Sequence, residues 1–150
     1  MTLPERVPSP EVAEAWIREC LSLHPEGADL RVSGTCMEPA LREGSRIRLR
    51  SPVGPIRVGD VVLLRTSAGL RLHRVVFQSG GELRTKGDRG LYLDPATSRS
   101  EVIARCVTRE PRWKALLRAA SSAVRLLARP WAPPKNPGRR GDAAHARLLP

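Results

Sequence analysis

The stretch RIRLR at residues 46–50 alternates basic and aliphatic side chains without interruption. Such a period of two is typical of a β-strand with one face in the core and the other in solvent. Turns rich in glycine, proline, serine or aspartate lie on both sides of it, and those at 67–69 and 79–81 suit hairpins. Working outward, we expect five more short strands, at 30–33, 61–66, 70–77, 82–86 and 102–108. The pattern predicts a mostly β protein built on a compact antiparallel domain.

Two helices are expected to flank this β region. Ser9 is a suitable cap, Pro10 suits the first helical position, and the apolar stripe that follows ends near His24. A second helix is expected over 112–129, basic on one side and apolar on the other. Its apolar stripe consists of Trp113, Leu116, Leu117, Ala120, Val124 and Leu127. We expect this stripe to pack on the β domain, with an anionic membrane or a partner's groove as the alternative.

The chain therefore divides into four parts: a helical segment at 1–29, the β domain at 30–110, the basic amphipathic helix at 111–129 and a tail at 130–150. Proline, glycine and arginine dominate the tail, which predicts disorder.

Positive charge is concentrated at the C-terminal end. The formal charge is +11, and residues 109–150 contribute ten Lys/Arg against two Asp/Glu. Such an excess can hold an anionic partner, although a solvated basic tail explains it equally well. Nucleic-acid binding ranks last among the functions considered, because no aromatic pattern or motif accompanies the charge.

The three cysteines, Cys20, Cys36 and Cys106, have no spacing typical of a disulfide framework or a zinc site. Cys20 and Cys106 each lie on an apolar face and are expected in the core. No secretory signal and no apolar run of about 18–20 residues is found, so we expect no transmembrane span. The sequence predicts a cytoplasmic protein without cofactor or metal, with peripheral contact to a membrane as an open alternative.

Cys36 differs from the other two cysteines because it follows a strand, with Gly34 before it and Pro39 after it. A thiol on such a turn is exposed at a strand end, and it needs a base to act as a nucleophile. His73 is the single histidine of the β region and interrupts an apolar strand. An imidazole base needs an acceptor that fixes its tautomer, and Asp88 and Asp94 both follow in turns. By spacing alone, this set is also compatible with a purely structural role.

Four boxes in this order resemble the superfamily of signal peptidase I and the self-cleaving repressors. The first is VSGTCMEPAL at 32–41, which is similar to the signature that carries the nucleophilic serine. VGDVV at 58–62 resembles the turn that enters a strand, and LHRVV at 72–76 the box with the general base. TKGD at 85–88, followed by Asp94, resembles the last box. Together the boxes cover residues 32–95.

The resemblance implies a β-rich fold of the signal-peptidase type and a peptidase activity. Histidine at position 73 is similar to the endoplasmic-reticulum and archaeal type, which uses serine, histidine and aspartate rather than a serine–lysine dyad. It implies that Asp94 orients His73, that Asp88 supports it, and that Cys36 stands at the position of the serine. The backbone N–H of Cys36 is then expected in the oxyanion hole, with Gly34 or Thr35 shaping the rest.

The hypothesis that follows is an endopeptidase that cleaves a peptide or leader segment through Cys36, His73 and Asp94. The expected substrate is an extended segment that docks as an added strand. The alternative is an inactive module that keeps the fold and binds a peptide. The missing anchor disfavours signal-peptide removal across a membrane, and the thirty or so residues before the first box leave no room for a repressor's helix-turn-helix.

Overall fold

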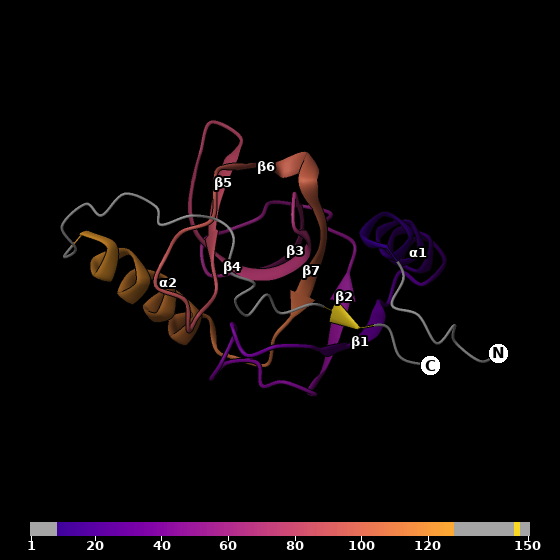
Figure 1. The fold of residues 1–150 in the computed structure, drawn as a ribbon, viewed down its shortest axis with the longest axis horizontal. Coiled ribbons are helices and arrows are strands. Elements are labelled where there is room, and N and C mark those ends of the chain that lie inside the picture. Colours follow the sequence, from indigo (N-terminus) through magenta and orange to yellow (C-terminus); the bar gives the residue numbers. More distant parts are fainter. Residues whose placement is uncertain (1–8, 128–145, 148–150) are drawn as a thin grey trace.

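The computed structural model describes residues 9–127 and 146–147, with side chains for 9–121. Two α-helices and a 3-10 turn accompany an eight-stranded sheet (Figure 1). The elements are α1 (Pro10–Leu23), β1 (Ala28–Val32), β2 (Arg46–Arg50), β3 (Val61–Thr66), β4 (Gly69–Ser79), β5 (Glu82–Lys86), β6 (Thr97–Ser98), η1 (Arg99–Glu101), β7 (Val102–Val107), α2 (Arg112–Leu127) and β8 (Ala146–Arg147). The predicted mostly β architecture with a helix at each end is confirmed.

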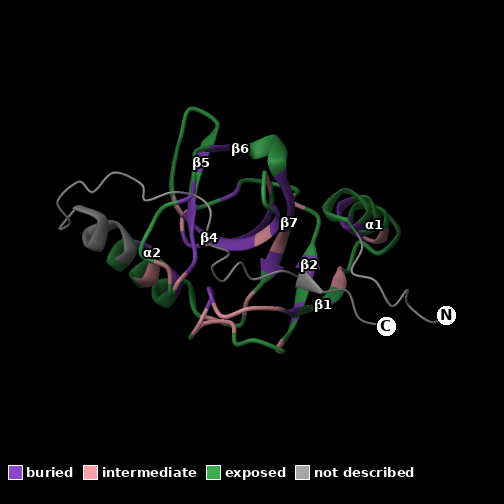
Figure 2. Cartoon of the chain, in the orientation of Figure 1, coloured by how far each residue is buried: buried purple, intermediate pink, exposed green. Residues whose placement is uncertain are grey.

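The strands follow the order β6-β5-β4-β3-β7-β2-β1-β8, and every neighbouring pair is antiparallel. Strand β2 shows the expected alternation, with Ile47 and Leu49 buried and its three arginines exposed. Strand β3 is buried on both faces, since Val61 and Leu63 pack into one cluster while Val62 and Leu64 pack into another. The middle of the sheet therefore has a core on each side, and the buried colouring lies mainly on the central strands (Figure 2).

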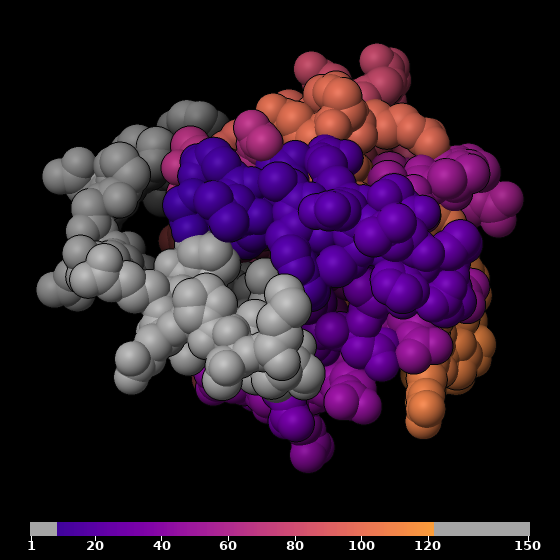
Figure 3. Space-filling view, turned by 90° about the vertical axis from the view of Figure 1, so that its right-hand side faces the viewer, coloured from indigo at the N-terminus to yellow at the C-terminus, as the bar shows by residue number. Residues whose placement is uncertain are grey.

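Helix α1 begins as the sequence predicts. Ser9 caps it, its side chain accepting a hydrogen bond from the N–H of Val12 at 3.4 Å. Ile17 and Leu21 are buried in the same cluster as Cys36 and Met37. In the view from the right-hand side of Figure 1, the N-terminal third of the chain forms most of the visible face (Figure 3).

Helix α2 corrects one prediction. Among the side chains described for this helix, up to residue 121, Ala115 and Ala119 are buried, and Ala115 lies against Gly59. The larger apolar residues point away from the domain, with Trp113 59%, Leu116 43% and Leu117 60% exposed. The expectation that the Trp113 stripe packs on the β domain is therefore wrong for the described side chains, because only small residues fit at this contact. An anionic membrane or a partner's groove stays a prediction for the exposed face.

Other differences concern short or terminal segments. Strand β1 begins two residues before the predicted start, and β4 extends to Ser79. Strand β6 and the η1 turn were not predicted, because two or three residues show no periodicity. Of the predicted disordered tail, residues 130–145 and 148–150 lie outside the described residues, whereas Ala146–Arg147 form β8. The helix predicted to 129 is described as far as Leu127.

Candidate active site

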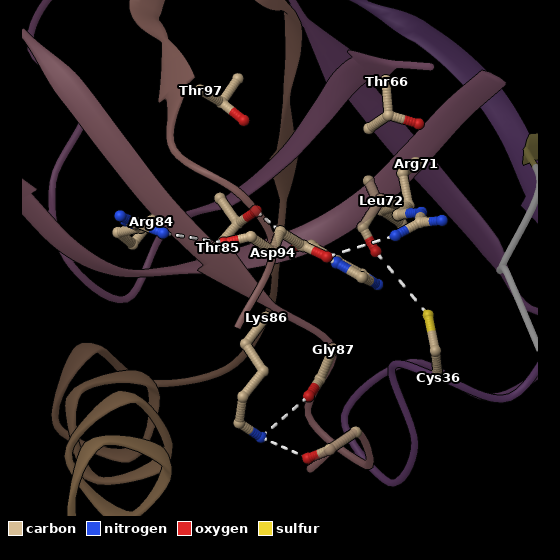
Figure 4. Close-up of polar contacts among 12 residues, drawn as sticks. Cys36, Thr66, Arg71, Leu72, Arg84, Thr85, Lys86, Gly87, Asp94 and Thr97 are labelled. Carbon is tan, nitrogen blue, oxygen red and sulfur yellow. Dashed lines mark hydrogen bonds and ion pairs between the residues drawn. The ribbon is translucent and has the colours of Figure 1, made fainter. Parts of the chain in front are cut away.

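The turn that carries Cys36 follows directly after β1. Gly34 adopts a φ of 90°, a conformation that suits glycine, and its N–H donates to Glu43 Oε1 at 3.1 Å. Met37 is fully buried and anchors the turn in the core. Cys36 is 9% exposed, and its Sγ lies 4.0 Å from the carbonyl oxygen of Leu72 on β4 (Figure 4). The turn therefore holds the sulfur against β4, the strand that carries His73. The Cys36 thiol is more buried than the sequence suggested.

His73 is buried on β4, and a carboxylate holds its ring. Its Nδ1 lies 2.5 Å from Oδ2 of Asp94. The same Oδ2 accepts a hydrogen bond from Thr85 Oγ1 at 2.6 Å, and Oδ1 accepts one from Arg71 at 3.3 Å. Asp94 is thereby fixed in place, and it keeps the proton of a neutral ring on Nδ1. The other nitrogen, Nε2, is left to act as a base.

The surroundings of Gly87 show how close His73 Nε2 lies to Cys36. A Cβ placed on Gly87 would lie 3.2 Å from His73 Nε2, 3.2 Å from Cys36 Cβ and 2.8 Å from the Cys36 carbonyl oxygen. One small gap thus adjoins both the imidazole nitrogen and the cysteine side chain, and only glycine fits there. The two residues are 37 positions apart in sequence, yet the fold brings them to the same point, as predicted.

The loop after β5 closes over this contact. The N–H of Arg89 donates to the Cys36 carbonyl at 2.9 Å, which ties the loop to the turn that carries Cys36. Inside the loop, the buried Lys86 donates to the carbonyls of Gly87 at 3.1 Å and Gly90 at 2.6 Å (Figure 4). The Lys86 ammonium and the Arg89 N–H therefore hold the loop in place around Gly87 through the carbonyls of Cys36, Gly87 and Gly90.

The pKa of His73 reflects these neighbours. Burial alone lowers it, but hydrogen bonds and charge attraction from Asp94 and Cys36 outweigh the burial and raise the pKa to about 9. Burial tends to raise the pKa of the Asp94 carboxyl, yet the contacts with His73, Thr85 and Arg71 bring it below its ordinary value. The arrangement thus favours the imidazolium form of His73 beside the Asp94 carboxylate.

Asp88 has a different partner from the one predicted. Both of its carboxylate oxygens accept hydrogen bonds from Arg74, each at 2.7 Å. Arg74 is almost fully buried and also donates to the Gly59 carbonyl at 2.8 Å. Asp88 therefore holds the loop through Arg74, and the expectation that it supports His73 directly is corrected. Sequence spacing could not reveal this, because neighbouring side chains on a strand point to opposite faces.

Cys36, His73 and Asp94 line a cleft of about 320 Å³. Its lining includes Arg71, Gly87 and the segment 90–95, whose Leu91 and Tyr92 are largely exposed. Arg71 and Thr85 were not singled out from the sequence; their signal was alternation on β4 and β5, which points them towards the same side as His73 and Asp94. The N–H of Cys36 donates no hydrogen bond to the described residues.

The comparisons with known proteins add no identification. No protein-family model, curated protein or solved structure matches this chain. The resemblance to signal peptidases therefore stays a prediction that rests on the four boxes. Among the described residues, no helix has the length and apolar character needed to cross a membrane.

Proposed function

We propose that the protein is a thiol endopeptidase in which Cys36 is the nucleophile, His73 the acid–base and Asp94 the residue that orients the ring. The observation that carries the proposal is the position of His73. Its Nδ1 is held by Asp94 at 2.5 Å, while its Nε2 borders the gap that also adjoins Cys36. This arrangement supports the roles of nucleophile, base and orienting acid for the three residues.

The reaction that we propose uses Cys36 as a thiolate and His73 as an imidazolium. The Cys36 thiolate attacks the carbonyl carbon of the scissile peptide bond, and the carbonyl oxygen becomes an oxyanion near the free N–H of Cys36. As the C–N bond breaks, the His73 imidazolium gives its Nε2 proton to the leaving amine, and a thioester remains. His73 then takes a proton from water as the water attacks the thioester. A carboxylic acid and the Cys36 thiolate are released.

The cleft supports an extended peptide as the substrate. It is open on one side, and the exposed Leu91 and Tyr92 give its rim an apolar character. Peptides that dock by strand addition gain affinity from backbone hydrogen bonds and specificity from pockets at alternate side chains.

A binding role without chemistry is the second candidate, because Cys36 is 9% exposed and its sulfur faces the Leu72 carbonyl. Such a module keeps the cleft and holds a peptide without cleaving it.

Cleavage of a proteome-derived peptide library, with the new termini read by mass spectrometry, tests the proposal. Wild-type protein is expected to generate new termini at one recurring motif. We expect Cys36→Ala and His73→Ala to lose at least about 10³-fold in rate while remaining folded. Cys20→Ala is the matched control, since it removes a thiol on α1 that does not line the cleft, and it should cleave normally. Equal cleavage by Cys36→Ala, or none by the wild type, contradicts the peptidase and leaves the binding module.

A further inference from the structure

Strand β8 occupies an edge of the sheet next to the candidate active site. Ala146 and Arg147 pair antiparallel with β1, with Ala146 opposite Val32 and Arg147 opposite Arg31 (Figure 1). The other edge of β1 is taken by β2, so β8 covers the position where a further strand would add. It also contacts β4, the strand of Arg71 and His73.

The direction of β8 shows how this edge of the sheet relates to the cleft. Strand β1 runs through Val32 into the turn that carries Cys36. Because β8 is antiparallel to β1, its backbone from Arg147 to Ala146 points towards that turn. A segment of the chain itself thus lies between the strand that leads to Cys36 and the strand that carries His73, in the manner of a peptide added to a sheet edge.

The register of the pair makes β8 an unfavourable partner for β1. Arg31 is the register partner of Arg46 in β2 and of Arg147 in β8, so arginines occupy three adjacent register positions. Like charges at facing positions destabilise a strand pair, whereas opposite charges stabilise it. Val32 is buried in the core, and the residue opposite it, Ala146, is small and apolar. The edge would therefore hold more tightly a peptide with a small apolar residue opposite Val32 and an acidic residue opposite Arg31.

We infer that residues 146–147 are an intramolecular competitor for the peptide-docking edge of β1, displaced by extended peptides with an acidic residue opposite Arg31. The inference rests on the proposed function only in treating the docked peptide as the substrate. A tethered segment competes at an effective concentration in the millimolar range for a short linker, so even a weakly paired strand masks the edge. Peptides without the acidic residue would be at a disadvantage against it.

Peptide binding to full-length chains that all carry Cys36→Ala tests the competitor without catalysis. The probe is a fluorescein-labelled copy of residues 141–150 with glutamate in place of Arg147, GDAAHAELLP. In the chain, Ala146→Pro with Arg147→Pro removes two backbone donors and releases the internal strand. This variant should bind the probe at least about ten-fold more tightly than the parent chain. Arg147→Glu strengthens the internal strand through Arg31 and should bind the probe about five-fold more weakly.

The charge at position 31 provides the matched control. In Arg31→Glu chains that also carry the two prolines, the preference should reverse, and the arginine copy GDAAHARLLP should bind better than the glutamate copy. Equal affinity of the parent, the double-proline and the Arg147→Glu chains, or no saturable binding to any of them, overturns the competitor. Unfolding by urea verifies that each variant is folded.

The outcome separates the two proposals. Peptide binding that follows the predicted order, in a protein whose Cys36 form cleaves nothing, contradicts the peptidase and keeps the competitor. Cleavage that proceeds equally in the parent and the double-proline chain, both with Cys36 intact, keeps the peptidase and contradicts the competitor.

Discussion

His73 and Arg74 are neighbours on β4, and each binds an aspartate from the segment after β5, yet the two pairs do different work. The His73–Asp94 pair opens to a cleft beside Cys36. The Arg74–Asp88 pair is closed off, and a second carboxylate, Glu110, lies 3.1 Å from the guanidinium. A permanent charge is held where it fixes the loop, and a titratable group is held where a ligand can reach it. We therefore expect Arg74 to govern stability and His73 to govern chemistry.

The largest effect should come from breaking the closed pair. Arg74→Met leaves the buried Asp88 carboxylate without its cation, while Glu110 keeps Arg118, and it is expected to lower the free energy of unfolding by about 3–5 kcal/mol. Urea denaturation measures the difference. Arg74→Lys keeps the charge but loses the bidentate geometry, so it should fall between the wild type and Arg74→Met. A cost below about 1 kcal/mol for Arg74→Met contradicts the structural role given to this pair.

The His73–Asp94 pair should instead be detected as a pH dependence of the free energy of unfolding. The pKa of His73 is raised to about 9, so its stabilising effect is complete below its ordinary value of 6.5 and is lost as the pH rises through about 9. The stabilising effect of Asp94 depends on pH in the opposite direction, because its pKa is lowered. This effect is present above pH 3.8 and is lost as the pH falls through the lowered pKa. The stability advantage of the wild type over His73→Gln should therefore shrink between pH 6 and pH 10, by about 3 kcal/mol at most. An advantage that grows over this range contradicts the raised pKa.

The smallest change in stability is expected at Gly87, which lies between the two pairs. There the loop after β5 packs against the turn that carries Cys36. Gly87→Ala places a Cβ 2.8 Å from the Cys36 carbonyl oxygen, closer than such contacts allow, and should cost about 1–3 kcal/mol of stability. Gly90→Ala is the matched control in the same loop, since its nearest neighbour would lie at 3.4 Å. It should be neutral within about 1 kcal/mol in the same urea titration. Equal costs for both substitutions would show that the loop does not pack on Cys36 as described.

Much of the fold could be predicted from periodicity, because each of the six longer strands carries several residues of alternating or continuous apolar character. The two-residue strands β6 and β8 carry too few residues for a pattern, and tertiary contacts alone define them. On α2 the sequence identified the apolar stripe but not its direction. Ala115 and Ala119 pack because they are small, a property of the neighbouring surface that the helix sequence does not contain.

The candidate site was predictable in part. Cys36, His73 and Asp94 lie close together, as the resemblance implied, although they come from the turn after β1, from β4 and from the segment between β5 and β6. Asp88 was assigned to the wrong neighbour, since its distance in sequence from His73 and from Arg74 differs by one residue. Arg71 and Thr85 were missed for a related reason: their hydrogen bonds to Asp94 depend on the register of β4 and β5, which no local pattern specifies.

The central claim is that Asp94 holds Nδ1 of the His73 ring while Cys36 lies beside Nε2, and an NMR titration of the ring tests it most directly. The ring signals can be assigned with His73→Gln. In the wild type we expect a pKa of about 9, which should fall in Cys36→Ala and fall further in Asp94→Asn, because each substitution removes a partner that favours the imidazolium. A ring that titrates near 6.5 and does not respond to Cys36→Ala would mean that the sulfur and the imidazole do not meet.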